Sequence, residues 1–346
     1  MLKLIKTVKD FQLMKINIQN LIDEVRKTLK NHEIGDGKYH RFLWQNEAKT
    51  RKMGNNEYGC ADAANIRYMI GDFERDPEKR AKEIEVLRDF QHENGLFDEG
   101  THHPIHCTAH CTAALELFDA APKFPLTALE KFKTKEGLYS LLENLLWVDS
   151  PWDNAHQGAG IYAAFILTGN ASPEWQKWYF DWLTKNTDKT YGIGIEGAIA
   201  KKKLPISHHL NGWFHYLFNF VFAHQPIPEA KKAVDTCIAI YGDKTEMLDY
   251  FGKRAGFAEI DWVYVINRAS RQEGYRVDEV KQLLRDFAKT YIKNLTECDH
   301  EKEEHWNDLH ALFGAVCALA ELQIALPGEI ITDYPLKLVL DRRPFI

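Results

Sequence analysis

The sequence predicts an all-α protein built from two alternating classes of helix. Three observations carry this prediction: apolar segments with polar starts recur along the chain, amphipathic segments separate them, and no stretch alternates apolar and polar residues over the length of a strand. Hydrophobic residues make up 45% of the 346 residues and charged residues 27%, which is the composition of a globular domain. We therefore expect a single domain over residues 1–346.

The stretch THHPIHCTAHCTAALELFD shows the apolar class most clearly. Four histidines and two cysteines crowd its first half, and small or apolar residues fill its second half. Pro104 suits the first turn of a helix, because its missing N–H costs nothing there, and His103 or Thr101 is the expected cap. The stretch is predicted to form a buried helix whose N-terminus opens into a cavity.

Six segments share this design at a regular spacing. One polar residue marks each of them: Asp62, His106, His156, His209, Asp261 and Asp308. The steps between the markers are 44, 50, 53, 52 and 47 residues, and a period near fifty is typical of a repeat architecture. The apolar helices are expected to start close together in space at one end of the molecule. Their predicted starts are near Asn56, His103, Trp152, His208, Glu259 and Trp306.

Six amphipathic segments lie between the apolar ones, and each has a charged opposite face, as a surface helix has. Two of them begin with a capping residue followed by proline, at Asp76-Pro77 and Ser172-Pro173. The connections contain glycine-bearing stretches that predict turns or short hairpins. These stretches are 35–44, 93–100 and 188–197. Residues 327–346 lose the helical period, and we expect this tail to pack over one end of the helices.

Twelve helices in two alternating classes close naturally into a double ring, with the apolar helices inside. The pattern resembles the (α/α)6 toroid, or barrel, shared by six-hairpin glycosidases and by the terpenoid-cyclase and protein-prenyltransferase fold. The stretch 91–119 is especially similar, because a helix ends in Gln91, a Gly-Leu-Phe excursion follows and a polar-headed helix begins. The sequence lacks the aspartate-rich and repeated Gln-Trp motifs of terpenoid cyclases, which disfavours that branch. The chain also resembles a bacterial protein family from which no activity carries over.

Composition restricts the partners and the compartment. The net charge is −6 and no basic stripe is present, which gives no reason to expect nucleic acid. The sequence contains no run of eighteen apolar residues, so no membrane span is predicted. The N-terminus is interrupted by lysines and does not look like a signal peptide. Six cysteines without a Cys-x-x-Cys pair predict reduced thiols in the cytoplasm. The oligomeric state is left open.

Carboxylates at the predicted helix starts favour glycoside hydrolysis. Asp62, Asp153 and Asp308 are the predicted catalytic acids and bases, because small or polar neighbours leave room for a substrate. Two carboxylates about 5–10 Å apart are the usual apparatus of this reaction. A single acid in a first helical turn is often only a cap or a partner of the helix dipole, but several acids with aromatic neighbours favour a function.

Other residues near the helix starts are expected to bind the sugar by hydrogen bonds or by ring stacking. They are Glu57, Tyr58, His102, His103, His106, His110, Trp152, His156, His208, His209, Asp261, Trp262, Trp306 and His310. The resulting hypothesis is a cytoplasmic enzyme that hydrolyses a small, uronate-containing or neutral oligosaccharide.

The histidines leave two alternatives open. His106 and His110 are one turn apart on one helical face, a spacing that can bind zinc. Because the sequence offers no clear third ligand, we expect no bound metal and no cofactor. A histidine acting as a general base would instead suit a polysaccharide-type lyase or a sugar epimerase. A toroid of helices that binds a ligand without catalysing a reaction is the third possibility.

Overall fold

The computed structural model describes residues 15–346. The first fourteen residues, which include most of the stretch assessed for a signal peptide, lie outside this range. The described chain is predominantly α-helical, so the all-α prediction is confirmed. Its strands are only two or three residues long: β1 (Ile16–Asn17), β2 (Glu33–Gly35), β3 (Lys38–Tyr39) and β4 (Ile330–Ile331). No helix within residues 15–346 combines the length and the apolar character needed to cross a membrane.

The two predicted classes of helix are both present. The even-numbered helices are buried on nearly all sides, and are called the inner helices below: α2 (Glu57–Ile70), α4 (Pro104–Leu117), α6 (Gln157–Leu167), α8 (Ile206–Phe222), α10 (Ala258–Glu273) and α12 (Leu309–Ala325). The odd-numbered helices expose one charged face: α1 (Gln19–His32), α3 (Pro77–Asp89), α5 (Lys135–Glu143), α7 (Pro173–Asn186), α9 (Ala230–Ile240) and α11 (Val277–Glu297). Short 3-10 turns are η1 (Thr127–Lys133), η2 (Ile199–Lys201) and η3 (Val339–Asp341).

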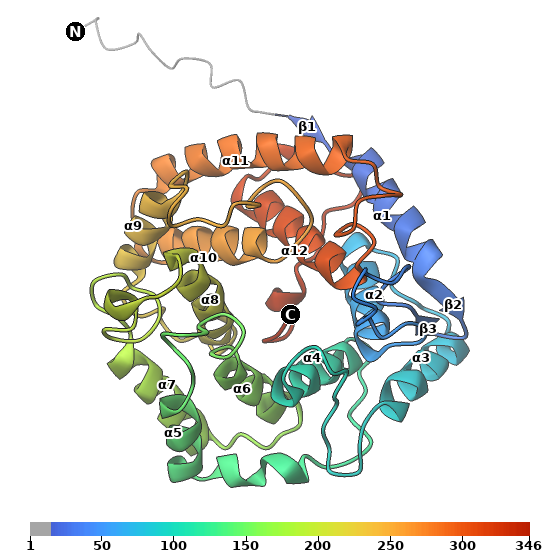
Figure 1. Cartoon of the computed structure of the whole chain (residues 1–346), viewed down its shortest axis with the longest axis horizontal. Coiled ribbons are helices and arrows are strands. Elements are labelled where there is room, and N and C mark those ends of the chain that lie inside the picture. Colours follow the sequence, from blue (N-terminus) through green and yellow to red (C-terminus); the bar gives the residue numbers. More distant parts are fainter. Residues whose placement is uncertain (1–14) are drawn as a thin grey trace, which may run out of the picture.

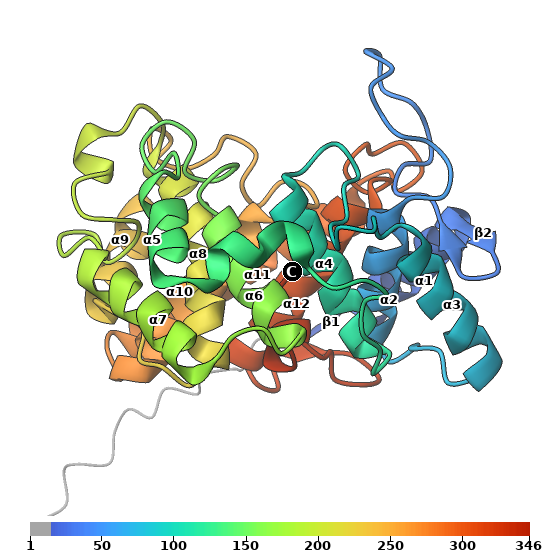
Figure 2. The same cartoon turned by 90° about the horizontal axis from the view of Figure 1, so that it is seen from below.

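The inner helices contact one another in chain order. Each packs against the next, and α12 packs against α2, so that the series of contacts closes on itself. In Figure 1 the inner helices surround the C-terminus, which lies at the centre of the view, and the odd-numbered helices lie at the periphery. The connections that lead into α2 and α4 rise on the same side of the molecule (Figure 2).

The predicted starts of α2 and α4 agree with the observed ones, because a side chain caps each of these helices at the expected residue. Asn56 caps α2 by accepting hydrogen bonds from the backbone N–H groups of Tyr58 and Gly59. His103 caps α4 through Nδ1, which accepts from the backbone N–H of Ile105 at 3.2 Å. The expected start of α6 at Trp152 is wrong, because residues 151–156 form turns and the helix begins at Gln157.

The glycine-bearing connections form turns, as expected, and one of them contains a hairpin. β2 and β3 pair antiparallel around Asp36 and Gly37, while the stretch before α8 contributes a single bridge between Thr187 and Ile195. The parallel pairing of β1 with β4 was not predicted. Strands of two residues are too short for the alternation that reveals a strand in a sequence.

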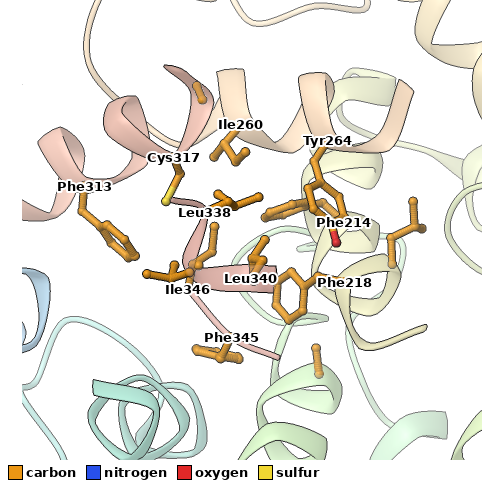
Figure 3. Close-up of a cluster of buried hydrophobic side chains, with 14 of the residues drawn as sticks. Phe214, Phe218, Ile260, Tyr264, Phe313, Cys317, Leu338, Leu340, Phe345 and Ile346 are labelled. Carbon is orange, nitrogen blue, oxygen red and sulfur yellow. The ribbon is translucent and has the colours of Figure 1, made fainter. Parts of the chain in front are cut away.

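The C-terminal tail lies among the inner helices and supplies part of their common core. Figure 3 shows Leu338, Leu340, Phe345 and Ile346 of the tail together with side chains of α8, α10 and α12. The neighbouring side chains labelled there are Phe214, Phe218, Ile260, Tyr264, Phe313 and Cys317. In Figure 1 the C-terminal end lies at the centre of the helices, so the tail fills the space that they surround.

Candidate functional site

A cavity of about 190 Å³ lies where the starts of several inner helices meet, and is called the histidine cavity below. It is lined by His102, His106, Trp152, Asp153, His156, His215, Phe257, His310 and Ile346. These residues belong to α4, α8 and α12, to the segments that precede α4, α6 and α10, and to the tail. A larger hollow of about 520 Å³ beside α9 and α11 has no histidine in its lining. The histidine cavity is therefore the better candidate for chemistry.

Five imidazole rings form a continuous row along the histidine cavity. Their order is His310, His102, His106, His156 and His215, and successive ring centroids are 5.2, 5.1, 4.4 and 5.3 Å apart. Burial lowers the pKa of His106 and His156 well below the usual value, and neighbouring imidazoles lower it further. Both rings are therefore neutral at physiological pH and keep a lone pair for a proton or a metal ion.

Asp62 lies between two histidines in the interior. His110 donates from Nε2 to Asp62 Oδ1 at 2.8 Å, and His310 donates from Nδ1 to Asp62 Oδ2 at 3.2 Å. Burial alone would raise the pKa of Asp62, but His310 and His110 outweigh it and hold the pKa well below its usual range. Asp62 therefore stays ionised at neutral pH, which favours a role as a base or a positioning group over that of a general acid.

The arrangement instead makes Asp62 a positioning residue for His310. His310 lines the cavity, and its Nδ1 is bonded to the buried carboxylate, so Nε2 is the nitrogen left for a ligand. Burial lowers the pKa of His310 to about 4, against the opposing effect of Asp62, so the ring is neutral at pH 7. A carboxylate that holds a histidine in one tautomer and stabilises its protonated form is the apparatus of a general base.

Asp308 takes part in a different network. Its Oδ1 caps α12 by accepting from the backbone N–H of His310 at 3.1 Å, and it also accepts from Arg41 Nε at 3.2 Å. Arg41 reaches Glu99 as well, at 3.4 Å, and Glu99 in turn accepts from His102 Nδ1 at 2.7 Å. Burial would raise the pKa of Glu99, but the hydrogen bond from His102 and the charge of Arg41 lower it to about 2. The network fixes the position of His102 in the row.

Among the three predicted catalytic carboxylates, Asp153 alone lines the histidine cavity. Trp152 lines it as well, and is the indole that the cavity offers for stacking on a sugar ring. Tyr58 stands just behind the row, where its hydroxyl lies 2.7 Å from Nδ1 of His106. Tyr58 is fully buried, so its contact with a ligand passes through His106.

Two predicted stacking residues belong to the core. Trp262 is turned towards the outer layer, where its indole N–H donates to the carbonyl of Cys237 in α9 at 3.0 Å. Trp306 likewise donates to the hydroxyl of Thr28 in α1 at 2.8 Å. These two indoles therefore lie away from the histidine cavity, because adjacent residues of a helix or turn point in different directions and these two point outwards.

The remaining predicted binding residues lie outside the cavity lining. Glu57 is paired with Lys52, whose Nζ is 3.3 Å away, and His103 is occupied as the cap of α4. His208 packs edge-on against Trp152, with ring centroids 6.0 Å apart, and His209 is buried with a pKa lowered by burial to about 4. His110 is held behind the row by Asp62.

Asp261 and Glu259 are buried acids near the start of α10 that the histidine cavity does not include. Neither carboxylate oxygen of Asp261 has a hydrogen-bond partner within residues 15–346, and the same holds for Oε2 of Glu259. Glu259 Oε1 accepts from the backbone N–H of Gly252 at 2.7 Å. Burial raises the pKa of Glu259 from 4.5 to about 7 and that of Asp261 well above its usual value.

This burial makes a prediction about stability and pH. In the folded protein the carboxyl group of Glu259 keeps its proton up to about pH 7, whereas in the unfolded chain it loses this proton near pH 4.5. The stabilisation is therefore complete below pH 4.5 and is lost as the pH rises through 7, by about 3 kcal/mol in order of magnitude. We expect Glu259→Gln to reduce the fall in the free energy of unfolding between pH 5 and pH 7.5, measured by urea denaturation.

The exposed Glu273, at the other end of α10, provides the control. Glu273→Gln should leave the pH dependence as in the wild type. Equal pH dependence in the wild type and in Glu259→Gln would show that Glu259 is ionised in the folded protein.

Several site residues were not identified from the sequence. His215 lies in the middle of α8, away from the helix start where candidates were sought. A signal was present, since His215 lies two helical turns after His208 on the same side of the helix. The connections before α2, α4 and α10 contain Arg41, Glu99 and Phe257. Helical periodicity does not indicate where the side chains of such connections point.

The comparisons with known proteins give no family for the chain. Neither a model of a protein family, nor a curated protein, nor a solved structure matches it. The site must therefore be interpreted from its own geometry.

Proposed function

We propose that this chain is an (α/α)6 toroid enzyme that acts on a small carbohydrate in the histidine cavity, by a proton transfer to His310. The observation that carries the proposal is the pairing of buried Asp62 with His310 at the cavity wall. The closed series of contacts among the inner helices supports the toroid. The indole of Trp152 and the row of hydrogen-bonding imidazoles support a sugar as the ligand.

The size and the charge of the site favour one reaction class. The cavity of about 190 Å³ is smaller than the roughly 300–1,000 Å³ of sites for drug-sized ligands, which suits one sugar unit better than an oligosaccharide. Asp62 is ionised and Asp308 is bound to Arg41, so two of the three expected carboxylates are committed to other partners. A lyase or an epimerase requires one base that removes a proton from carbon, and His310 has the protonation state for this role.

Glycoside hydrolysis is the second candidate, favoured by the position of Asp153 beside Trp152 at the cavity. The two reactions differ in the bond that breaks. An epimerase breaks and re-forms a C–H bond, and a lyase breaks a C–H bond and expels the oxygen on the neighbouring carbon to form a C=C bond. A hydrolase breaks the glycosidic C–O bond with the addition of water and breaks no C–H bond.

A substrate screen in deuterium oxide separates these outcomes. The protein is incubated with neutral and uronate mono- and disaccharides and followed by proton NMR and by ultraviolet absorbance. We expect either an epimer that has gained one deuterium on carbon or an unsaturated product that has lost one carbon-bound hydrogen. Release of a reducing sugar with neither deuterium on carbon nor an unsaturated product would support hydrolysis. If a ligand raises the melting temperature and no product forms, the chain is a binding protein, and the proposal that it is an enzyme is contradicted.

A further inference from the structure

Three of the cavity histidines converge from three different inner helices. His106 comes from α4, His156 is the residue before the first turn of α6, and His215 comes from the middle of α8. One ring nitrogen of each lies within 4.8 Å of a ring nitrogen of the other two, and all three side chains are buried. The sequence predicted no metal because it offered no clear third ligand beside His106 and His110. The structure supplies two further ligands for His106, namely His156 and His215.

Hydrogen bonds fix which nitrogen each ring offers. Nδ1 of His215 lies 2.9 Å from the backbone carbonyl oxygen of Asn211, and a carbonyl can only accept, so Nδ1 carries the proton and Nε2 has the lone pair. Nδ1 of His106 is occupied by the hydroxyl of Tyr58 at 2.7 Å, which leaves Nε2 for a ligand. Histidines that bind metals in proteins are held in this way through their second nitrogen.

His156 provides the observation that points most directly to a bound ion. Both of its ring nitrogens are buried and neither makes a hydrogen bond of good geometry within residues 15–346, although the backbone of Trp152 lies close to the ring. Buried polar groups are nearly always satisfied by a protein group, a water molecule or an ion, and an imidazole without a partner is costly. The ring nevertheless lies between His106 and His215, with centroids 4.4 and 5.3 Å away. A cation bound by all three would satisfy it.

A second group of possible ligands lies nearby, and its chemistry is different. Asp62, His110 and His310 also have ligand atoms within 4.8 Å of one another. Their atoms already satisfy one another, because both carboxylate oxygens of Asp62 accept hydrogen bonds from the two rings. An ion there would have to displace two charge-assisted hydrogen bonds, whereas an ion at the three histidines displaces none that the structure shows.

We infer that His106, His156 and His215 bind one divalent transition-metal ion, most simply Zn²⁺, with its remaining coordination position open to the histidine cavity. Imidazole nitrogens suit zinc, copper, iron and nickel, and three protein ligands with one open position are the usual pattern of a catalytic zinc site. Such an ion would supply a Lewis acid that polarises a substrate oxygen or lowers the pKa of a bound water molecule. The inference does not depend on the identity of the substrate.

The test measures metal binding directly, with protein produced without a polyhistidine tag. The chain is stripped with a chelator, dialysed and titrated with ZnCl₂ in competition with a chromogenic chelator, and the zinc content is then measured by mass spectrometry. We expect about one zinc per chain and a higher melting temperature in the loaded protein. Loading with Co²⁺ should give the visible absorption bands of a tetrahedral nitrogen site.

Three variants distinguish the proposed ligands from their neighbours. His156→Phe keeps a ring of similar shape, and it should abolish stoichiometric zinc binding. Tyr58→Phe removes only the hydroxyl that holds His106, and should weaken zinc binding by about 10–100-fold, as outer-shell changes typically do. It also provides the test if His156→Phe does not fold. His92, which is exposed, gives the control His92→Gln, and this variant should bind zinc like the wild type.

Two results would overturn the inference. One is a wild-type chain that binds no zinc, cobalt or other transition metal after loading. The other is binding that survives in His156→Phe and disappears in His310→Asn, which would place the ion at Asp62. Zinc binding as expected without any sugar chemistry would leave this inference intact and would contradict only the proposed function.

Discussion

Replacement of His310 by glutamine is expected to lower the turnover of the sugar substrate by about 10²–10⁴-fold, the usual effect of losing a general base. His310 Nδ1 donates to the buried carboxylate of Asp62, so the imidazole can take a proton on Nε2 and remain stabilised. Glutamine has no basic nitrogen at neutral pH. The loss should appear in kcat more than in KM, because the base acts in the transition state. Steady-state kinetics on the substrate found in deuterium oxide measures both.

Asp62→Asn provides the partner variant for this experiment. If Asp62 acts only through His310, the double variant should be about as slow as the slower single variant, because residues that act as a unit are not additive. His92→Gln, at an exposed position, should retain wild-type turnover. Normal turnover of His310→Gln combined with loss of activity in Asp153→Asn would contradict the histidine mechanism and support glycoside hydrolysis.

The electrostatics of Asp62 show what sequence reasoning missed. The sequence placed an acid at the start of a buried helix, and from this alone a raised pKa is a reasonable expectation. The structure brings in His110 from 48 positions away in the chain and His310 from 248 positions away. The charges of these two histidines, together with the hydrogen bonds that they donate, outweigh burial and lower the pKa of Asp62. A pKa set by such distant groups cannot be inferred without the fold.

Helical periodicity and capping residues made most of the secondary structure predictable. The starts of α2 and α4 follow from Asn56 and His103, whose side chains accept backbone N–H groups, whereas α12 begins at Leu309 after the cap Asp308, three residues beyond the expected Trp306. The direction of each side chain was harder to infer. Asp261 and Trp262 are neighbours at the start of α10, and Trp262 bonds to the outer helix α9. Proximity to a helix start therefore did not imply access to the cavity.

The tail shows a second reason for the incomplete prediction. Residues 327–346 have no helical period, so the sequence indicated a segment on one end of the helices. The structure places Leu340 and Phe345 among buried side chains of the inner helices (Figure 3). Arg343 is also fully buried, and it donates to Asn65 of α2 and to the backbone carbonyl of Phe345. The interior that receives these residues exists only after six distant helices have come together.

Replacement of Phe345 by alanine is therefore expected to lower the free energy of unfolding by about 3–5 kcal/mol, the usual cost of truncating a buried phenylalanine. Its ring is fully buried, and it lies 4.8 Å from the ring of His106 and 5.9 Å from that of Phe218, measured between centroids. The truncation removes these contacts and leaves a cavity that the surrounding helices cannot close. Chemical denaturation of the wild type and the variant at one pH measures the difference.

Tyr334 offers a matched control, because it is an aromatic residue of the same tail with 73% of its surface exposed. Tyr334→Ala should change the free energy of unfolding by no more than about 0.5 kcal/mol, as surface substitutions usually do. Phe345→Leu should fall between the two, since leucine refills part of the space beside His106. A Phe345→Ala variant as stable as Tyr334→Ala would mean that the tail does not occupy the centre of the helices in solution, and the histidine cavity would then be open on that side.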